Sequence, residues 1–411
     1  MAASSDTWKT KIDAAVEHRY DDLVAVRRYL HVHPEISGEE HETSLYLYQM
    51  LSDAGFDVQM GPDGRGLIVE SRRNAEGPLL ALRADIDALR IQDEKLVPYR
   101  SQKDGVMHAC GHDAHTAILV GALTALKELE ANGDLPWPVN VRGIFQPAEE
   151  TSTGAAELVA AGVLDKVDAI LALHVDPSRT VGRIGIRTGI LTANCDVMRL
   201  TIVGRGGHAA RPHEAIDPIA TAAQLISCIY LSIPRATDSQ DAVVVTIGCV
   251  QGGSNPNVIP EQVELHGTLR TLDDGVRDRA MQHIEQICRG IAESSGTKIQ
   301  VAFEARIGAV CNDRHLADLI RQVAGESLGQ DHVEEIQRPS MGSEDFAVYL
   351  QHVPGAMLRL GCAKSGSNGT PLHNASFDLD EAAIGIGSKL IAHAAINWSA
   401  AGQIPPEKAS R

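Results

Sequence analysis

The sequence is poor in basic residues and aromatic residues and has no long hydrophobic run. It contains 37 Lys and Arg against 54 Asp and Glu, a formal net charge of −17, which repels phosphate backbones and anionic lipid surfaces. No stretch approaches the ~18 consecutive apolar residues of a membrane span, and Met1–Asp22 lacks the apolar core of a secretory signal. We expect a soluble, cytoplasmic protein that uses neither nucleic acid nor a membrane as its main partner.

A disulfide framework and three common catalytic motifs are also missing. The seven cysteines are odd in number and widely scattered, which favours reduced thiols, one of them a candidate ligand. Gly252-Gly253-Ser254 is not followed by the Lys and helix of a phosphate loop. The chain also has no Gly-x-Ser-x-Gly elbow and no His-Glu-x-x-His helix.

The composition is that of a globular α/β protein. With 411 residues, 44% of them hydrophobic and 22% charged, two or three domains are expected. Helical periodicity alternates with short apolar runs in the first half of the chain, which predicts a central mixed sheet flanked by helices, with catalytic groups at strand ends. The expected helices lie near Lys11–His31, Thr43–Ala54, Ala114–Ala131 and Gly154–Ala161, and the strands near Leu67–Ser71, Pro78–Ala84, Val139–Phe145 and Ala169–His174.

The middle of the chain has a different pattern. Between residues 194 and 307 the expected order is β-α-β-β-α-β, which is typical of a ferredoxin-like α+β module. We therefore predict a discontinuous catalytic domain of residues 1–193 and 308–411, with residues 194–307 inserted as a separate domain.

Two clusters carry most of the predicted chemistry. In Met107–His115, Cys110 and His112 are two residues apart, so in an extended loop they could clasp one ion; a buried thiol beside a helix-capping Asp113 is an equally good interpretation. The second cluster follows a strand and ends in Glu149-Glu150. One carboxylate could bind metal while the other acts as a general base on water, but a solvated helix start is the more common fate of such a pair.

Single histidines and one aspartate complete the candidate site. His174 ends an apolar strand and His373 lies near the end of the chain; each alone is more often a core or surface residue than a ligand. Asp85 ends another strand and could orient a ligand histidine, or serve as an ordinary turn residue. Together the donors suit two closely spaced divalent ions that share a bridging ligand or water: Cys110, His112, Glu150, His174 and His373.

The ordered motifs resemble the aminoacylase-type metallopeptidase superfamily, and within it the amidohydrolases that include hippurate hydrolases, N-acetyl amino acid deacetylases and auxin-conjugate hydrolases. The resemblance covers nearly the whole chain. Its motifs are His31–Glu35, Arg83–Leu89, Met107–Thr116, Phe145–Glu150, Gly206–Pro218, Asn257–Pro260, Gly267–Thr271, Ser343–Phe346 and Leu372–Asn374.

The resemblance implies a two-metal catalytic domain with an inserted lid and dimerisation domain. It implies that the five donors named above are the metal ligands and that Glu149 is the general base, which deprotonates the attacking water and protonates the departing amine. His208 matches a lid histidine that stabilises the oxyanion, often in the partner subunit's site, and Asn257 and Arg270 match positions that hold the substrate carboxylate.

The predicted activity is metal-dependent cleavage of N-acyl amino acids, such as N-acetyl or hippurate-like compounds, by a homodimer or larger oligomer. A dipeptidase or aminopeptidase on the same scaffold is the enzymatic alternative, and a non-catalytic metal- or small-molecule-binding dimer is the other. A thiolate ligand favours zinc, while His and Glu ligands also admit manganese, cobalt or nickel. Thr151–Gly154 and Ile91–Asp93 depart from the pattern of the relatives close to the expected pocket, and with 4% aromatic residues the acyl group stays open.

Overall fold

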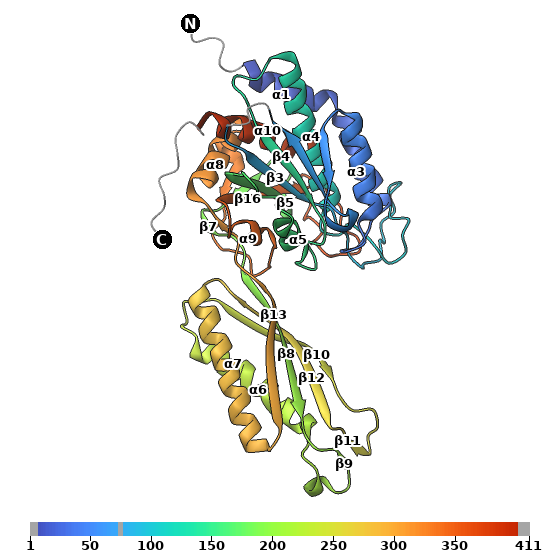
Figure 1. Ribbon diagram of the computed structural model, residues 1–411, viewed down its shortest axis with the longest axis vertical. Coiled ribbons are helices and arrows are strands. Elements are labelled where there is room, and N and C mark those ends of the chain that lie inside the picture. Colours follow the sequence, from blue (N-terminus) through green and yellow to red (C-terminus); the bar gives the residue numbers. More distant parts are fainter. Residues whose placement is uncertain (1–6, 73–76, 402–411) are drawn as a thin grey trace. The chain divides into compact units, whose positions relative to one another are not determined.

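The computed structural model describes residues 7–72 and 77–401, apart from a few side chains, and divides the chain into two compact units. Unit 1 comprises residues 1–189, 311–337 and 348–411, and unit 2 comprises residues 190–310 and 338–347 (Figure 1). Residues 1–6 of the segment examined for a secretory signal lie outside the described residues. The predicted inserted domain of residues 194–307 lies within the segment 190–310 of unit 2. Residues 338–347, which the prediction assigned to the catalytic domain, also belong to unit 2.

Unit 1 is built on a mixed sheet of eight strands in the order β1-β2-β4-β3-β5-β16-β6-β15. Its strands are β1 (Asp57–Met60), β2 (Leu67–Ser71), β3 (Leu80–Asp85), β4 (Val141–Gln146), β5 (Ala169–Thr180), β6 (Ile184–Ile186), β15 (Val333–Glu335) and β16 (Gly355–Ala363). Its helices are α1 (Thr7–His18), α2 (Tyr20–Val32), α3 (His41–Asp53), α4 (His112–Asn132), α5 (Gly154–Ala160), α8 (Arg314–Leu328) and α10 (Ala382–Ala401). Short elements complete the chain around the unit: β7 (Gly189–Ile190), β14 (Cys311–Asn312), α9 (Phe346–Tyr349) and 3-10 turns at Pro62–Gly64 and Gln330–His332.

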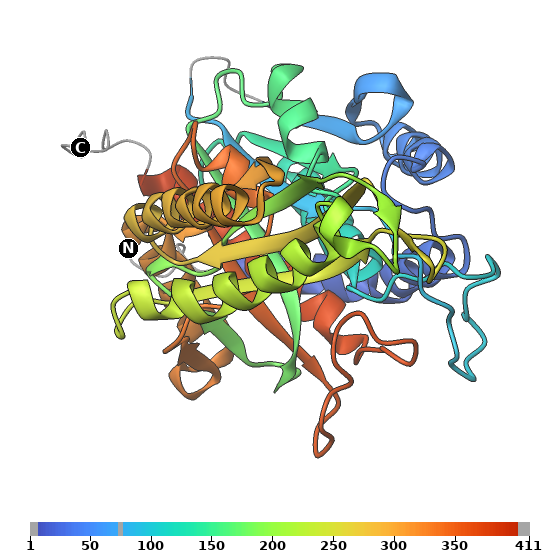
Figure 2. The ribbon, with the colours of Figure 1, turned by 90° about the horizontal axis from the view of Figure 1, so that it is seen from below.

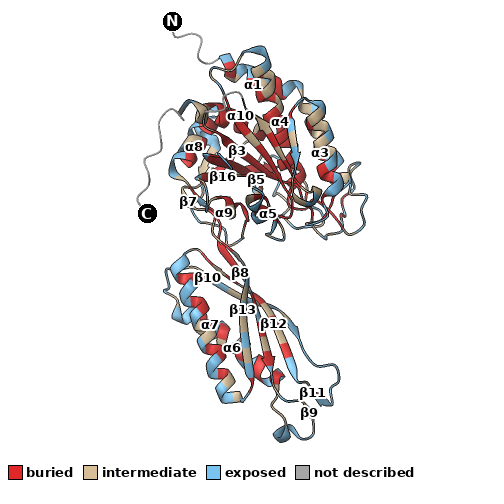
Figure 3. Cartoon of the chain, viewed as in Figure 1, coloured by how far each residue is buried: buried red, intermediate tan, exposed pale blue. Residues whose placement is uncertain are grey.

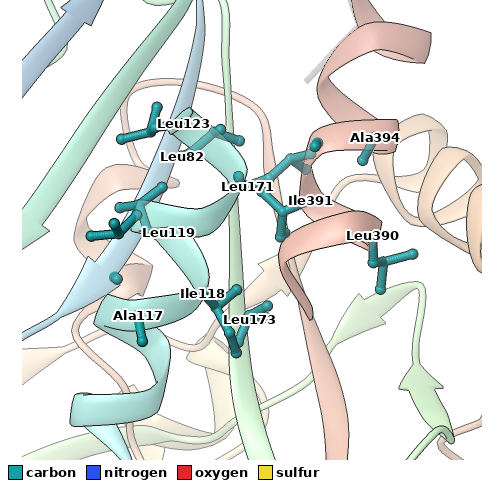
Figure 4. Packing of buried hydrophobic residues seen from close by; sticks show 14 of the residues in the cluster. Leu82, Ala117, Ile118, Leu119, Leu123, Leu171, Leu173, Leu390, Ile391 and Ala394 are labelled. Atoms are coloured by element: carbon teal, nitrogen blue, oxygen red, sulfur yellow. The ribbon is translucent and has the colours of Figure 1, made fainter. Parts of the chain in front are cut away.

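The central strands are buried along their whole length because helices cover the sheet. Every residue of β3 is buried, as is every residue but one of β16, as expected for strands with covered faces. Figure 4 shows the packing of α4, β5 and α10 through side chains such as Leu119, Leu171 and Ile391. This core fixes the positions from which the polar residues of the candidate site extend.

Parallel pairing aligns the end of β3, the segment after β4 and the middle of β5, which continues to Thr180 and does not end at His174 as predicted. β3 pairs in parallel with both β4 and β5, with Arg83 opposite Ile144 and Ala172. Asp85 and His174 lie two residues beyond the paired Arg83 and Ala172, and the segment after β4 carries Glu149 and Glu150. The carboxyl ends of parallel strands form the ligand-binding edge of α/β sheets.

The first predicted helix is two helices. α1 ends at His18 and α2 starts at Tyr20, with Arg19 between them at φ −100° and ψ 4°. Arg19 donates a hydrogen bond from Nη1 to Ala15 O and forms an ion pair with Glu128. The hydrophobic periodicity continues across this break, so the pattern alone predicted a single helix.

Unit 2 has the predicted β-α-β-β-α-β order. Its strands pair antiparallel in the order β10-β12-β8-β13, and α6 and α7 lie side by side on one face of that sheet (Figure 2). The main elements are β8 (Asn194–Val203), α6 (Pro218–Ala236), β10 (Val243–Gln251), β12 (Gln262–Thr271), α7 (Asp274–Ser295) and β13 (Lys298–Ile307). A two-stranded ribbon of β9 (Gly207–His208) and β11 (Val258–Ile259), with a 3-10 turn at Pro212–Glu214, completes the unit.

Helix α6 has enough length and apolar character to cross a membrane, judged by those two properties alone. It nevertheless contributes Leu225, Ile229 and Ile233 to the core of unit 2. Core helices of globular proteins commonly pass the same test, so the helix is weak evidence for a membrane.

Candidate functional site

The first ligand candidates lie at the start of α4. Gly111 adopts φ 87° immediately before the helix, and a Cβ atom on it would lie 2.5 Å from Val175 Cγ2, so only glycine fits here without displacing β5. This turn replaces the extended loop expected from the sequence. It places Cys110 before the helix and His112 in its first turn, and both side chains are buried.

Five donors from four segments converge around Cys110. Cys110 Sγ lies 3.4 Å from His174 Nε2, and His373 Nε2 lies 3.2 Å from Glu150 Oε1. The donor atoms of Cys110, His112 and His174 lie within 4.8 Å of one another, and so do those of Cys110, Glu150 and His373. Cys110 belongs to both groups, as a ligand shared by two ions would.

His115 bonds the middle of β5 beside this cluster. Its Nδ1 donates to Asp85 Oδ1 at 2.6 Å, and its Nε2 accepts from Val175 N–H at 2.9 Å. His174 in turn donates from Nδ1 to Val175 O at 2.8 Å, which leaves its Nε2 facing Cys110. Asp85 therefore orients His115, whose two ring nitrogens are both used within the protein and which bonds the backbone of Val175 next to His174.

Asp87 connects the two halves of the cluster. One carboxylate oxygen accepts from His112 Nδ1 at 3.0 Å, and the other accepts from Glu150 N–H at 3.0 Å and Ser37 Oγ–H at 2.7 Å. This contact fixes the tautomer of His112, with Nε2 as the remaining donor atom.

Glu149 and Glu150 occupy a tight turn after β4. Ala148 and Ser152 have φ 52° and 59°, and Ser152 N–H donates to Glu149 O at 2.7 Å. A carboxylate oxygen of each glutamate and a ring nitrogen of His112 lie within 4.8 Å of one another. The two side chains therefore do not diverge as they would in the extended chain expected from the sequence.

Burial and charge set the protonation of the donors. Burial raises the pKa of the Cys110 thiol and lowers that of His174. Burial would also lower the pKa of His112, but Asp85 and Cys110 raise it overall. Cys110 and Glu150 raise the pKa of His373 to about 10. Because ligands bind metal in their deprotonated forms, a bound cation would displace these protons.

The types of donor atom in the cluster, and their burial, fit divalent metal ions. His112 Nε2 is buried and makes no hydrogen bond among the described residues, whereas the buried Glu150 Oε1 faces His373 Nε2 at 3.2 Å. Buried polar atoms without partners are rare and costly. The set of one thiolate, one carboxylate and three imidazoles is a ligand chemistry that zinc and similar ions accept.

The other three predicted site residues belong to unit 2. His208 lies on β9 opposite Val258 of β11, and Ala209 N–H donates to Asn257 O at 3.1 Å, so the ribbon brings His208 and Asn257 together. Arg270 lies on β12 and donates from Nη1 to Met341 O at 2.9 Å.

No role was assigned from the sequence to Asp87 and His115, two residues whose hydrogen bonds hold the candidate ligands in place. The available signal was spacing: Asp87 follows Asp85 by two, on the same face of an extended chain, and His115 follows His112 by three on one helix face. Neither spacing identifies its partner, which lies in another segment.

The profile of peptidase family M20/M25/M40 matches residues 81–397. This chain belongs to that family. It is 38% identical over 376 residues to an N-acetylcysteine deacetylase of Bacillus subtilis, an alignment that covers 91% of this chain and 96% of the relative. It is 35% identical over 384 residues to IAA-amino acid hydrolase ILR1-like 4 of Arabidopsis thaliana, covering 92% and 86%.

A solved structure has the same fold. A Bacillus subtilis protein described as a dinuclear metal-binding peptidase of family M20 superimposes with a TM-score of 0.78 at 34% identity, covering 93% of this chain and 99% of that chain. The resemblance predicted from the motifs is thereby confirmed. This M20-family chain is a metal-dependent amidohydrolase that uses divalent ions.

Proposed function

We propose that this M20-family chain hydrolyses the amide bond of N-acyl amino acids at the donor cluster of unit 1. The observation that carries the proposal is the placement of a buried carboxylate, Glu149, within 4.8 Å of the donor atoms of His112 and Glu150. A metal store needs ligands but no adjacent base, which argues against the non-catalytic alternative.

Two divalent ions per chain would be held by the five donors Cys110, His112, Glu150, His174 and His373. Bound there, the ions would supply Lewis acidity for the amide carbonyl and lower the pKa of a water molecule. The thiolate favours zinc, and the imidazole and carboxylate ligands admit manganese, cobalt or nickel. Asp87 holds the ring of His112 through Nδ1, and the carbonyl of Val175 holds the ring of His174 through Nδ1, in the orientations that ligation requires.

Glu149 would move the proton. As general base it takes a proton from the attacking water, and as general acid it returns that proton to the departing amine. Glu149 is 8% exposed. The exclusion of water strengthens the interaction of its carboxylate with charge that develops in the transition state.

Residues of unit 2 would recognise the substrate. His208 Nδ1 accepts from Ala210 N–H at 3.1 Å, so its proton lies on Nε2 and can be donated to an oxyanion, in its own or a partner subunit. Arg270 and Asn257 would hold the free carboxylate of the substrate, a role suited to the planar guanidinium of arginine. Residues 194–307 would then act as a lid over the catalytic residues of 1–193 and 308–411.

The same unit would form a homodimer. β10 is an edge strand, and edge strands pair readily with a second copy. α6 exposes Ile219 by 47%, Tyr230 by 40% and Leu231 by 71%, an apolar surface that a second copy would cover. Larger assemblies of such dimers are compatible with this surface. A cytoplasmic location fits the site, because a reducing compartment keeps the Cys110 thiol available.

The amino acid and acyl group of the substrate lie within the range of the relatives, which include an N-acetylcysteine deacetylase and an IAA-amino acid hydrolase. The test is amine release from N-acetyl, N-benzoyl and indole-acyl amino acids and from dipeptides, before and after chelation and readdition of zinc, manganese, cobalt or nickel. We expect cleavage of acyl amino acids that chelation abolishes and one of these metals restores.

Other outcomes separate the alternatives. Cleavage confined to dipeptides would establish the peptidase alternative. Bound metal without cleavage of any substrate would contradict hydrolysis and establish the binding protein.

A further inference from the structure

The turn that carries Glu149 has an unusual backbone. We call residues 147–154 the base turn. Ala148 adopts φ 52°, a region that L-residues other than glycine, asparagine and aspartate rarely occupy. The turn is also tightly closed: Thr153 N–H and Gly154 N–H both donate to Ala148 O at 3.2 Å, and a Cβ on Gly154 would lie 1.6 Å from Pro147 O. Such a conformation persists only where its surroundings impose it.

Two buried carboxylates hold the amides on either side of Glu149. Asp87 accepts from Glu150 N–H at 3.0 Å. Glu40, distant in sequence, accepts from Ala148 N–H through Oε1 at 2.7 Å. The residue before the base and the residue after it are therefore both anchored to side chains of other segments.

Glu40 is itself firmly placed. It is fully buried and precedes the first residue of α3, where its carbonyl accepts hydrogen bonds from Ser44 N–H and Ser44 Oγ–H. Ser44 Oγ in turn accepts from Gly66 N–H at 2.8 Å, next to the strand pairing of Leu67 with Phe145. Glu40 is thus tied to the strand from which the base turn emerges.

The carboxylate is costly at this position. Oε2 has no hydrogen-bond partner among the described residues and forms an ion pair with Arg65 Nη1 at 3.6 Å. Burial raises the pKa of Glu40. A buried carboxylate destabilises the fold when one of its oxygens lacks a hydrogen bond, unless the hydrogen bond made by the other oxygen compensates for this cost.

We propose that Glu40 is a positioning residue for the general base: its hydrogen bond to Ala148 N–H imposes the left-handed conformation of the base turn and so directs the Glu149 carboxylate. The inference rests on the proposed role of Glu149. Glu40 touches neither Glu149 nor the donor cluster in the contacts described, and it acts through the backbone.

The proposed role requires a hydrogen-bond acceptor in the side chain of residue 40, and it does not require a negative charge there. In Glu40→Gln the amide oxygen can still accept from Ala148 N–H, so the turn keeps its shape. In Glu40→Ala the amide of Ala148, a residue that is 1% exposed, loses its acceptor, and Ala148 can relax out of its strained conformation. A displacement of a catalytic group by about 1 Å can cost about 100-fold in rate.

The experiment compares Glu40→Ala, Glu40→Gln and Glu35→Ala. Glu35 is a matched control, because its buried carboxylate accepts from Thr43 N–H at 2.8 Å at the start of the same helix but has no contact with the base turn. We expect Glu40→Ala to lower kcat about 10- to 100-fold with KM changed by less than about threefold, while Glu40→Gln and Glu35→Ala keep kcat within about threefold of wild type.

Hydrogen exchange of peptides covering residues 147–154 provides a readout that does not depend on catalysis. Faster exchange in Glu40→Ala but not in Glu40→Gln or Glu35→Ala, at equal metal content, supports the inference. Unchanged exchange and unchanged kcat in Glu40→Ala would overturn it, and so would an equal loss of kcat in Glu40→Gln. If Glu149→Gln keeps its activity, Glu149 is not the general base. The hydrogen-exchange result would still decide whether Glu40 holds the base turn.

Discussion

The two units use their sheets differently. In unit 1, β3 and β16 are buried almost throughout, whereas in unit 2 burial along β12 alternates from residue to residue and β10 has no buried residue (Figure 3). Helices on both faces of a sheet leave only its strand ends for polar chemistry, while helices on one face leave a whole surface for contacts. On this comparison we propose that unit 1 carries the chemistry and that unit 2 recognises the substrate.

Buried charge follows the same division. In unit 1, Arg27 is fully buried and pairs at 2.8 Å with Asp113, the residue that follows the candidate ligand His112. In unit 2 a buried pair joins Arg277 to Asp196, at 2.8 and 2.6 Å, away from any group of metal donors. Buried ion pairs can thus support a reactive site or only a fold, and the following variants distinguish the two.

The largest effect is expected at Glu149. Glu149→Gln removes the proposed base and keeps the shape of the side chain, so kcat should fall at least about 1,000-fold with metal content unchanged. Steady-state kinetics and metal analysis on the same preparation test this. Glu157→Gln, a nearby variant of an acid that pairs with Arg65, should behave as wild type. Activity within tenfold of wild type in Glu149→Gln would remove Glu149 from the mechanism.

The next effect should be confined to unit 2. Asp196→Ala removes the hydrogen-bonded partner of the buried Arg277 and leaves its longer ion pair with the exposed Asp274 at 3.9 Å, which should destabilise unit 2 by up to about 3–5 kcal/mol. Calorimetry should show an earlier transition for unit 2, with metal content retained by unit 1. Loss of metal in this variant at a temperature where the chain is folded would contradict the proposal that unit 1 binds metal independently of unit 2.

A smaller, pH-dependent effect is expected at Asp93 in unit 1. Burial would raise the pKa of this carboxyl, but hydrogen bonds from His31, Ser101 and Lys95 lower it well below its ordinary value. A lowered folded-state pKa stabilises the fold above the ordinary carboxyl pKa of about 4. That stability is lost as the pH falls toward the folded-state value.

Asp93→Asn should therefore be less stable than wild type by about 1–3 kcal/mol at pH 7, with the difference shrinking below about pH 5. Thermal unfolding across that pH range is the measurement, with the exposed Asp104→Asn of the same loop as control. A difference that grows on acidification would show that the sign is wrong.

The smallest effect on folding should come from the exposed face of unit 2. Leu231→Glu places a charge on a residue that is 71% exposed, so the free energy of unfolding of the chain should change by about 0.5 kcal/mol or less. Light scattering should report a shift from dimer to monomer, with Gln224→Glu on the same helix as control. An unchanged mass would place the dimer contact elsewhere or exclude it.

Hydrophobic pattern predicted most elements to within a few residues. β2 matches its predicted bounds and α5 agrees within one residue at each end, because these segments have apolar periodicity and are bounded by turn residues. The break at Arg19, the edge strand β1, the central strand β16 and the last helix α10 were not predicted. At Arg19 the hydrophobic periodicity continues across the break, so the local pattern did not reveal it.

For the candidate site, the sequence predicted the residue types but not their geometry. The donors could be proposed because the motifs resemble a known family, yet the left-handed turns at Gly111 and Ala148 were not visible in an alternating pattern. Long-range hydrogen bonds, such as that from Ala148 to Glu40, leave no local signal in one sequence.

The most direct test of the central claim is the metal content of the purified, metal-loaded chain, measured together with X-ray absorption at the metal edge. The account predicts two ions per chain, with a sulfur ligand at about 2.3 Å if the ion is zinc, and predicts loss of that sulfur signal and of tight binding in Cys110→Ala but not in Cys195→Ala. Two ions bound as tightly in Cys110→Ala, or a wild-type spectrum without a sulfur ligand, would contradict it.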